Sequence, residues 1–320
     1  MIDRRVRILE RIDVANQRGL ELGPLHHPIV ERDGTQVLYV DHADTATLRQ
    51  KYEGHDIGEI VEVDVVWDRR LAAALGERGP VGYVVASHVI EHVPDLVGWL
   101  AEVAEVLAVG GVLSLAIPDK RFCFDRRRAE TQLADVVEAH LQARRRPSAR
   151  QVFDFWSGLH EIDTAAAWAG TLDDDTPLGQ DELALQKMSE AGASTDYVDV
   201  HCWVFTPRSF LDVLGRLMAL GMVPAFALAA FHPTEPGTLE FHASLERLAD
   251  DLPIEERRRR QEAALAAARA SLDTAGADHA YVLLSASERR AVDLKRAAMG
   301  RMRAVAGRAR RLLASARVRP

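Results

Sequence analysis

Two histidines and a glutamate stand within one short string, Ser87-His88-Val89-Ile90-Glu91-His92-Val93-Pro94. Formally this is an H-x-x-E-H sequence, which on one continuous helix would give a zinc peptidase two imidazole ligands and a base. The string follows the apolar run 81–85, however, and Pro94 leaves little room for a helix before a new element begins. A strand end followed by a loop therefore fits better, and a structural role for both histidines stays open.

A glycine and a carboxylate follow two other short apolar runs. Gly23 comes directly after residues 20–22, and Asp41 after residues 37–40. A glycine at a strand end lets the backbone approach a ligand closely, and a carboxylate there can accept hydrogen bonds from ribose hydroxyls. The structural alternatives are a tight turn at Gly23 and a solvated side chain at Asp41.

Five apolar runs alternate with helical patterns between residues 19 and 119. This alternation predicts an α/β fold with a doubly wound, mostly parallel sheet, because helical crossovers make successive strands parallel. The carboxyl ends of such strands share one edge, where open sheets bind ligands. The expected strands are 20–22, 37–40, 60–66, 81–86 and 112–117, and the expected helices are 45–52, 69–77 and 95–107.

The rest of the chain divides into further segments. Thr206-Pro207 is a typical helix start, and strands at 223–231 and 238–245 would form an antiparallel pair after that helix. Long helices are expected at 254–272 and 287–316, and shorter ones at 126–143, 148–156 and 182–190. We therefore predict an N-terminal helix (1–18), a sheet core (19–119 and 206–247), a helical insertion (120–205) and a helical C-terminal extension (248–320).

Composition narrows the class of protein. The 320 residues are 48% hydrophobic and 28% charged, which is ordinary for globular chains. Two cysteines are too few for a disulfide framework or a multi-cysteine zinc site, so a reducing, cytoplasmic compartment is expected. The formal net charge of −8 argues against a nucleic-acid partner, because phosphate binding needs a basic surface.

The C-terminal segment has the opposite charge. Residues 288–320 contain eleven Arg or Lys and two acids. We expect a basic helix over 287–320 that contacts an acidic partner, another subunit or an anionic membrane surface. A solvated helix is the alternative.

Taken in chain order, the motifs resemble those of class I S-adenosylmethionine-dependent methyltransferases over residues 19–119 and, more weakly, 206–247. The chain departs from the family where Pro24-Leu25-His26-His27-Pro28 replaces the usual run of glycines, and where Val109 replaces a usual proline. The matching strings are Leu20-Glu21-Leu22-Gly23, Val37-Leu38-Tyr39-Val40-Asp41, Ser87-His88-Val89-Ile90-Glu91-His92-Val93, Leu107-Ala108-Val109-Gly110-Gly111-Val112-Leu113 and Ile117-Pro118-Asp119.

The resemblance implies a seven-stranded Rossmann-like sheet with S-adenosylmethionine (SAM) as cofactor. It implies that the adenine amine is bound by Asp64, with Asp68 an equal alternative. The remaining implied cofactor contacts are Glu21, Gly23 and Pro24 at the methionine end, Asp41 at the ribose, His42 against the adenosine, and Ser87 and His88 beside the sulfonium.

The expected reaction is O-methylation of a hydroxyl on a saccharide or other small polar metabolite. A general base would assist it, and the candidates are His201, His88, Asp119 and Asp199. Asp199 alternates with His201 along 199–203 and is a candidate orienting acid. No spacing identifies metal ligands, but a divalent metal held by Asp119 and Asp199 is kept open as a second cofactor.

The insertion 120–205 is the expected acceptor pocket. Its residues Trp156 and Trp168 offer stacking faces and the acids 173–175 offer hydroxyl-binding oxygens, although core packing explains tryptophans equally well. The strings 117–121 and 201–207 look similar to methyltransferases associated with glycan assembly. Two other functions stay open: a non-catalytic interaction protein that keeps the fold as a scaffold, and the zinc peptidase.

Overall fold

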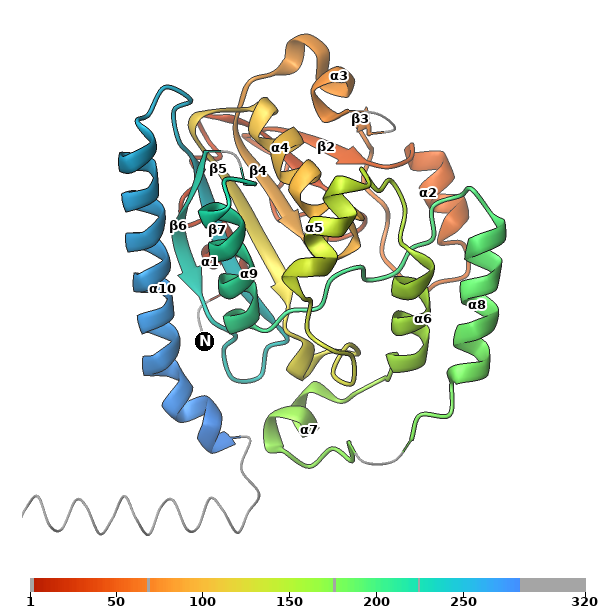
Figure 1. Ribbon diagram of the computed structural model, residues 1–320. Coiled ribbons are helices and arrows are strands. Elements are labelled where there is room, and N and C mark those ends of the chain that lie inside the picture. Colours follow the sequence, from red (N-terminus) through yellow and green to blue (C-terminus); the bar gives the residue numbers. More distant parts are fainter. Residues whose placement is uncertain (1–2, 68–69, 175–176, 224, 283–320) are drawn as a thin grey trace, which may run out of the picture.

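A single mixed sheet of seven strands runs through the protein in the order β3-β2-β1-β4-β5-β7-β6 (Figure 1). The computed structural model describes residues 3–67, 70–174, 177–223 and 225–282. Strands β1 to β5 pair in parallel, and β7 is antiparallel to both β5 and β6, which confirms the predicted fold class. The strands are β1 (Arg18–Leu22), β2 (Gln36–Asp41), β3 (Val65–Val66), β4 (Val81–Ser87), β5 (Leu107–Pro118), β6 (Phe226–His232) and β7 (Glu240–Arg247).

Helices cover the two faces of this sheet unequally. On one face, α3, α4, α9 and α10 pack against alternate apolar residues such as Leu20, Val84 and Leu115. The other face is covered by Ile8 of α1 and by the β1–β2 connection, whose Ile29 is buried. The helices are α1 (Arg4–Leu9), α2 (Thr45–Lys51), α3 (Leu71–Leu75), α4 (Leu96–Val106), α5 (Leu133–Leu141), α6 (Ala149–Gly158), α7 (Thr164–Ala169), α8 (Asp181–Ala193), α9 (Pro207–Ala219) and α10 (Ile254–Val282), with short 3₁₀ turns at Gly76–Arg78, Ile90–His92 and Lys120–Phe122.

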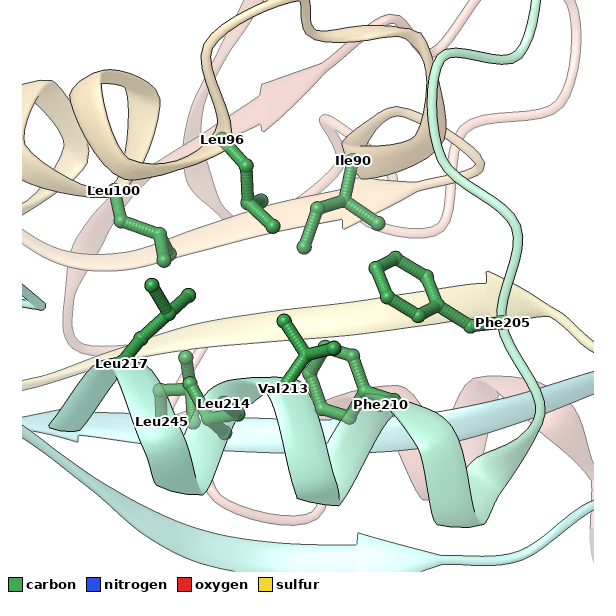
Figure 2. A pocket seen from close by; sticks show the side chains of 9 residues that line it. All are labelled: Ile90, Leu96, Leu100, Phe205, Phe210, Val213, Leu214, Leu217 and Leu245. Carbon is green, nitrogen blue, oxygen red and sulfur yellow. The ribbon is translucent and has the colours of Figure 1, made fainter. Parts of the chain in front are cut away.

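Helix α9 begins where the sequence predicts. Thr206 is its cap, Pro207 opens its first turn, and Ser209 completes a capping box. Figure 2 shows its apolar face against the sheet and α4, around a space of about 10 Å³. A gap of that size holds at most one water, so this is packed core rather than a ligand site. Its lining consists of Ile90, Leu96, Leu100, Phe205, Phe210, Val213, Leu214, Leu217 and Leu245.

Two predicted elements are much shorter than expected. The N-terminal helix ends at Leu9 rather than near residue 18, because the Asp13 carboxylate accepts hydrogen bonds from both the backbone and the side-chain amide of Asn16 and fixes a turn. The third strand spans only Val65–Val66. Just before it the Asp64 backbone N–H still donates to the Tyr39 carbonyl of β2, but the N–H groups of Val61 and Val63 donate to the Leu25 carbonyl and the Thr45 hydroxyl instead.

The insertion 120–205 is helical, as predicted, and α6, α7 and α8 gather to one side of the sheet (Figure 1, green). Helix α5 begins at Leu133 instead of residue 126, because the chain before it forms turns around the buried Arg128. Helix α7 was not predicted. None of the helices among the described residues combines the length and the apolar composition that crossing a bilayer requires. The predicted basic helix 287–320 lies outside the described residues.

Candidate functional site

The strand order of the sheet reverses between β1 and β4. The chain runs from β1 outward through β2 to β3 and then returns to the other side of β1 as β4. Open parallel sheets bind ligands outside the carboxyl ends of strands at such a switch point. Gly23, after β1, is in the left-handed conformation (φ +61°), and a Cβ on it would lie 3.4 Å from Cγ2 of Val89, after β4. The two strand-end loops therefore adjoin, as the sequence predicted for one shared edge.

Asp41 ends β2 at the same edge. Its side chain is buried, and its Oδ1 accepts the backbone N–H of His42 at 2.7 Å and lies 2.6 Å from Nδ1 of the same residue. Among the described residues no hydrogen bond is made to Oδ2 of Asp41. One carboxylate oxygen thus remains for a hydroxyl donor, next to the half-exposed His42 ring.

Glu21 points to the opposite face of the sheet from its β1 neighbours. Its two oxygens accept the backbone N–H groups of Ile29 at 2.6 Å and Val30 at 2.8 Å. Burial raises the pKa of Glu21 to about 7 against the lowering effect of those two hydrogen bonds. Both oxygens therefore hold the β1–β2 connection, which carries Pro24. The direct contact with the methionine end of SAM that we expected for Glu21 is replaced by this role in shaping the loop.

This contact predicts the effect of Glu21→Gln on stability. A glutamine amide would turn an NH₂ group toward Ile29 or Val30 and leave one buried N–H without an acceptor. We expect the free energy of unfolding to fall by about 1–3 kcal/mol, measured by urea denaturation. An unchanged free energy would contradict the role of Glu21 in holding the loop.

Asp64 does not occupy the place expected for it. It lies directly before β3 and not at its carboxyl end, because β3 begins only at Val65. Its Oδ2 accepts the Tyr39 backbone N–H at 2.7 Å, and Arg32 pairs with both oxygens at 3.2 and 2.9 Å. The carboxylate thus ties β2 to the edge of the sheet. The alternative, Asp68, lies outside the described residues.

Ser87 and His88, at the end of β4, are held by residues distant in sequence. Arg4 of α1 donates to Oγ of Ser87 at 2.8 Å and binds both oxygens of Glu240 at 2.7 and 2.9 Å. Nε2 of His88, whose backbone is left-handed (φ 54°), lies 2.7 Å from Glu240. Burial lowers the pKa of His88, but the hydrogen bond to Glu240 and the nearby charges outweigh burial and raise it above 6.5.

The residues after His88 turn away from it. Ile90–His92 is one 3₁₀ turn, so the helical H-x-x-E-H site of a zinc peptidase is absent from this described segment. His92 instead meets His201, with ring centroids 4.6 Å apart, and its Nδ1 lies 2.8 Å from Asp199, a close ionic contact without hydrogen-bond alignment. Glu91, His92 and His201 place one potential ligand atom each within 4.8 Å of one another.

His201 is a buried histidine with a different acid partner from the predicted one. Its Nδ1 lies 2.5 Å from Oδ2 of Asp125, which in turn pairs with Arg128. The predicted partner Asp199 contacts His92 and Lys51 instead, because 199–203 is not a strand and the expected alternation of faces does not apply. With Nδ1 held by Asp125, Nε2 of His201 is directed toward Glu91, at 4.0 Å.

Asp119 is not available as a base or as a metal ligand. It is fully buried, and Arg121 donates to both of its oxygens. The hydroxyl of Thr234 donates to Oδ2 at 2.6 Å as well. These contacts correct both roles expected for Asp119, which instead anchors the end of β5.

The aromatic residues of the insertion divide into two groups. Trp168 stacks on Phe122, with ring centroids 3.9 Å apart and planes 4° from parallel, and is buried, so its faces are closed to an acceptor. Phe124 and Phe155 surround His201, with ring centroids 4.8 and 5.9 Å from its ring, and Phe124 is exposed. Nothing in their sequence spacing pointed to these two phenylalanines. Trp156 packs edge-on against Phe155, and Asp174 pairs with Arg126.

No protein-family model matches the chain, and no curated protein matches it. Among solved structures, it is similar to the CcbJ methyltransferase from Streptomyces caelestis (15% identity, 77% of this chain and 89% of that one, TM-score 0.41). It is also similar to magnesium protoporphyrin IX methyltransferase from Synechocystis PCC 6803 (11%, 76% and 80%, TM-score 0.35). The chain spans about half of the CurJ carbon methyltransferase (13%, 75% and 51%, TM-score 0.35). The solved structures that the chain resembles thus include SAM-dependent methyltransferases, and identities and TM-scores of this size carry no argument about its reaction.

Proposed function

We propose that the protein is a SAM-dependent methyltransferase that methylates a hydroxyl of a saccharide or another small polar metabolite. The observation that carries the proposal is the switch point between β1 and β4, with left-handed Gly23 on one side and the loop of Ser87 and His88 on the other. The ordered motifs along β1, β2, β4 and β5 favour SAM among the ligands that such an edge can bind.

The residues at this edge fit the cofactor. The unpartnered Oδ2 of Asp41 would accept a ribose hydroxyl, and the half-exposed ring of His42 would lie against the adenosine. The backbone at Gly23 carries no side chain that would fill the space beside β1. When bound, SAM would supply an electrophilic methyl group on its sulfonium, and the protein would chiefly position the acceptor.

The acceptor side of the proposal rests on the residues around His201. Phe124 and Phe155 offer ring faces, as saccharide-binding sites often do, and Nε2 of His201 is turned toward the carboxyl end of β4. A cavity of about 310 Å³ lies on the insertion side between α5 and α6, and both charged side chains and the apolar residues Cys202, Trp203 and Val204 line it. Its acids and arginines are groups that bind hydroxyls, which favours a polar acceptor.

SAM binding by calorimetry tests the cofactor site. We expect the wild-type chain to bind SAM and Asp41→Ala to bind it about tenfold to a hundredfold more weakly, because a hydrogen bond to a charged group contributes about 1.5–3 kcal/mol. The matched control is Asp33→Ala, which removes an exposed acid from the same β1–β2 connection and should leave the affinity unchanged.

Two outcomes would contradict the proposal. Well-folded protein that does not bind SAM would exclude the cofactor, and equal affinity in Asp41→Ala would exclude this edge as its site. Release of S-adenosylhomocysteine across a panel of saccharides and hydroxylated metabolites separates an enzyme from the scaffold protein that the altered glycine motif left open: a scaffold would bind SAM without any release.

A further inference from the structure

We propose that Glu91, His92 and His201 form a binding site for one transition-metal dication, which binds and polarises the acceptor hydroxyl. The metal's role in methyl transfer rests on the proposed function, whereas the metal site itself rests on the contacts below. The three residues come from two segments that pack together: the backbone carbonyl of Glu91 accepts the N–H groups of Cys202 at 2.6 Å and Trp203 at 3.2 Å.

The carboxylate of Glu91 is the strongest indication of a cation-binding site. Its side chain is fully buried, and within the described part of the chain neither carboxylate oxygen has a hydrogen-bond partner. Nδ1 of His88 lies 3.5 Å and Nε2 of His201 lies 4.0 Å from Oε1 of Glu91. Burying a carboxylate without a partner is costly, and a cation coordinated by that oxygen would remove the cost.

Each histidine has a carboxylate beside its Nδ1, through a hydrogen bond for His201 and through an ionic contact for His92. A ligating imidazole generally presents its second nitrogen to a carboxylate or carbonyl, which fixes the ring and its tautomer. His201 does so with Asp125 at 2.5 Å, and His92 faces Asp199 at 2.8 Å. Two histidines and one carboxylate, with open positions for water or substrate, form the ligand set of many catalytic metal sites, and imidazole favours transition metals over Mg²⁺.

The place of the cluster suits a role in methyl transfer. It directly follows the β4 end of the switch point, and Phe124 and Phe155 flank it. A cation there would lower the pKa of an acceptor hydroxyl. The hydroxyl proton would pass to solvent water, the acceptor oxygen would form the new O–CH₃ bond, and the S–CH₃ bond would break to leave S-adenosylhomocysteine. His201 would then be a ligand rather than the general base expected from the sequence.

Titration of metal-free protein with Co²⁺ and Zn²⁺ tests the site, with calorimetry for stoichiometry and visible absorption for Co²⁺ coordination. We expect one ion per chain for the wild type and at least tenfold weaker binding for Glu91→Gln and His201→Ala. Asp125→Asn, which takes the carboxylate away from Nδ1 of His201 and also from Arg128, should weaken binding about 10–100-fold in protein shown by circular dichroism to be folded. The control His55→Ala removes an exposed histidine that is not one of the three ligands and should bind like the wild type.

Thermal unfolding without metal separates a metal site from a structural ion pair. Because the Glu91 carboxylate is unpartnered, metal-free Glu91→Gln should be at least as stable as the wild type, whereas a structural ion pair with His88 or His201 would make it less stable. No binding by the wild type, or undiminished binding by Glu91→Gln, would overturn the inference. SAM titrations of the same samples keep the two proposals distinct: SAM binding without metal binding refutes only the metal site, and metal binding without SAM binding refutes only the proposed function.

Discussion

Replacement of Arg128 by Met is expected to lower the free energy of unfolding by about 3–5 kcal/mol. The guanidinium is 1% exposed and bonds to Asp125 at 2.7 Å, to Asp154 at 2.8 Å and to the backbone carbonyl of His201 at 2.9 Å. Met keeps much of the side-chain volume but leaves the buried Asp125 carboxylate without its guanidinium partner. Leaving a buried charge without its counter-ion is among the most destabilising changes in proteins.

Urea denaturation measures this loss, and Arg150→Met is its matched control. Arg150 pairs with Asp135 in the same insertion, but its side chain is 75% exposed, so the control should lose at most about 1 kcal/mol. If both variants lose the same small amount, Arg128 does not hold the segment that carries His201.

Replacement of Glu240 by Gln is expected to lower the free energy of unfolding by about 2–3 kcal/mol. The Glu240 carboxylate is buried and receives Arg4 on both oxygens, His88 at 2.7 Å and His242 at 3.0 Å. A glutamine at this position removes the negative charge that these groups share and turns an NH₂ group toward donors. The exposed ion pair of Glu62 with Arg49 provides the control, since Glu62→Gln should leave the free energy of unfolding nearly unchanged.

The cost of Glu240→Gln should depend on pH in a defined way. In the folded protein the pKa of His88 is raised above 6.5. The stability that protonated His88 adds through Glu240 is therefore fully present below pH 6.5, and it is lost as the pH rises through the raised pKa. Burial raises the pKa of Glu240, but His242, His88 and Arg4 outweigh burial and hold it well below 4.5, so its contribution is present above pH 4.5 and is lost as pH falls.

The stability difference between wild type and Glu240→Gln should therefore be widest between pH 4.5 and 6.5 and should narrow on both sides. Denaturation curves at a series of pH values measure it. A difference that keeps growing above pH 8 would show that His88 does not share its proton with Glu240.

Local sequence patterns are sufficient to predict the sheet and to place Gly23 and Asp41 at the same edge of it. Short apolar runs bounded by turn residues marked the strands, and Thr206-Pro207 marked the start of α9, because hydrophobic periodicity and helix capping act over a few residues. The positions of Gly23 and Asp41 at one edge followed from parallel pairing. The same patterns indicate the third strand but make it too long, since the N–H groups of Val61 and Val63 donate to Leu25 and Thr45 instead of to β2.

The side-chain partners of the site could not be predicted, because they depend on contacts between distant segments. Arg4 and Glu240 are 236 positions apart, and His201 and Asp125 are 76 apart. No periodicity relates such pairs; only the folded insertion brings Asp125, rather than the nearby Asp199, to His201. The lack of a hydrogen-bond partner for the Glu91 carboxylate likewise depends on the residues packed around it. The sequence string that contains Glu91 and His92 nevertheless singles out two of the three residues of the proposed metal site.

The pairing between residues 91–93 and 202–203 has a consequence for engineering. The Glu91 carbonyl accepts two N–H groups from Cys202 and Trp203, and the Trp203 indole donates to the Val93 carbonyl at 2.6 Å. This seam fixes the backbone that carries His92 and His201 without using any residue of α7 or α8. Foreign sequence grafted into α7 or α8 would therefore leave the backbone support of His92 and His201 in place.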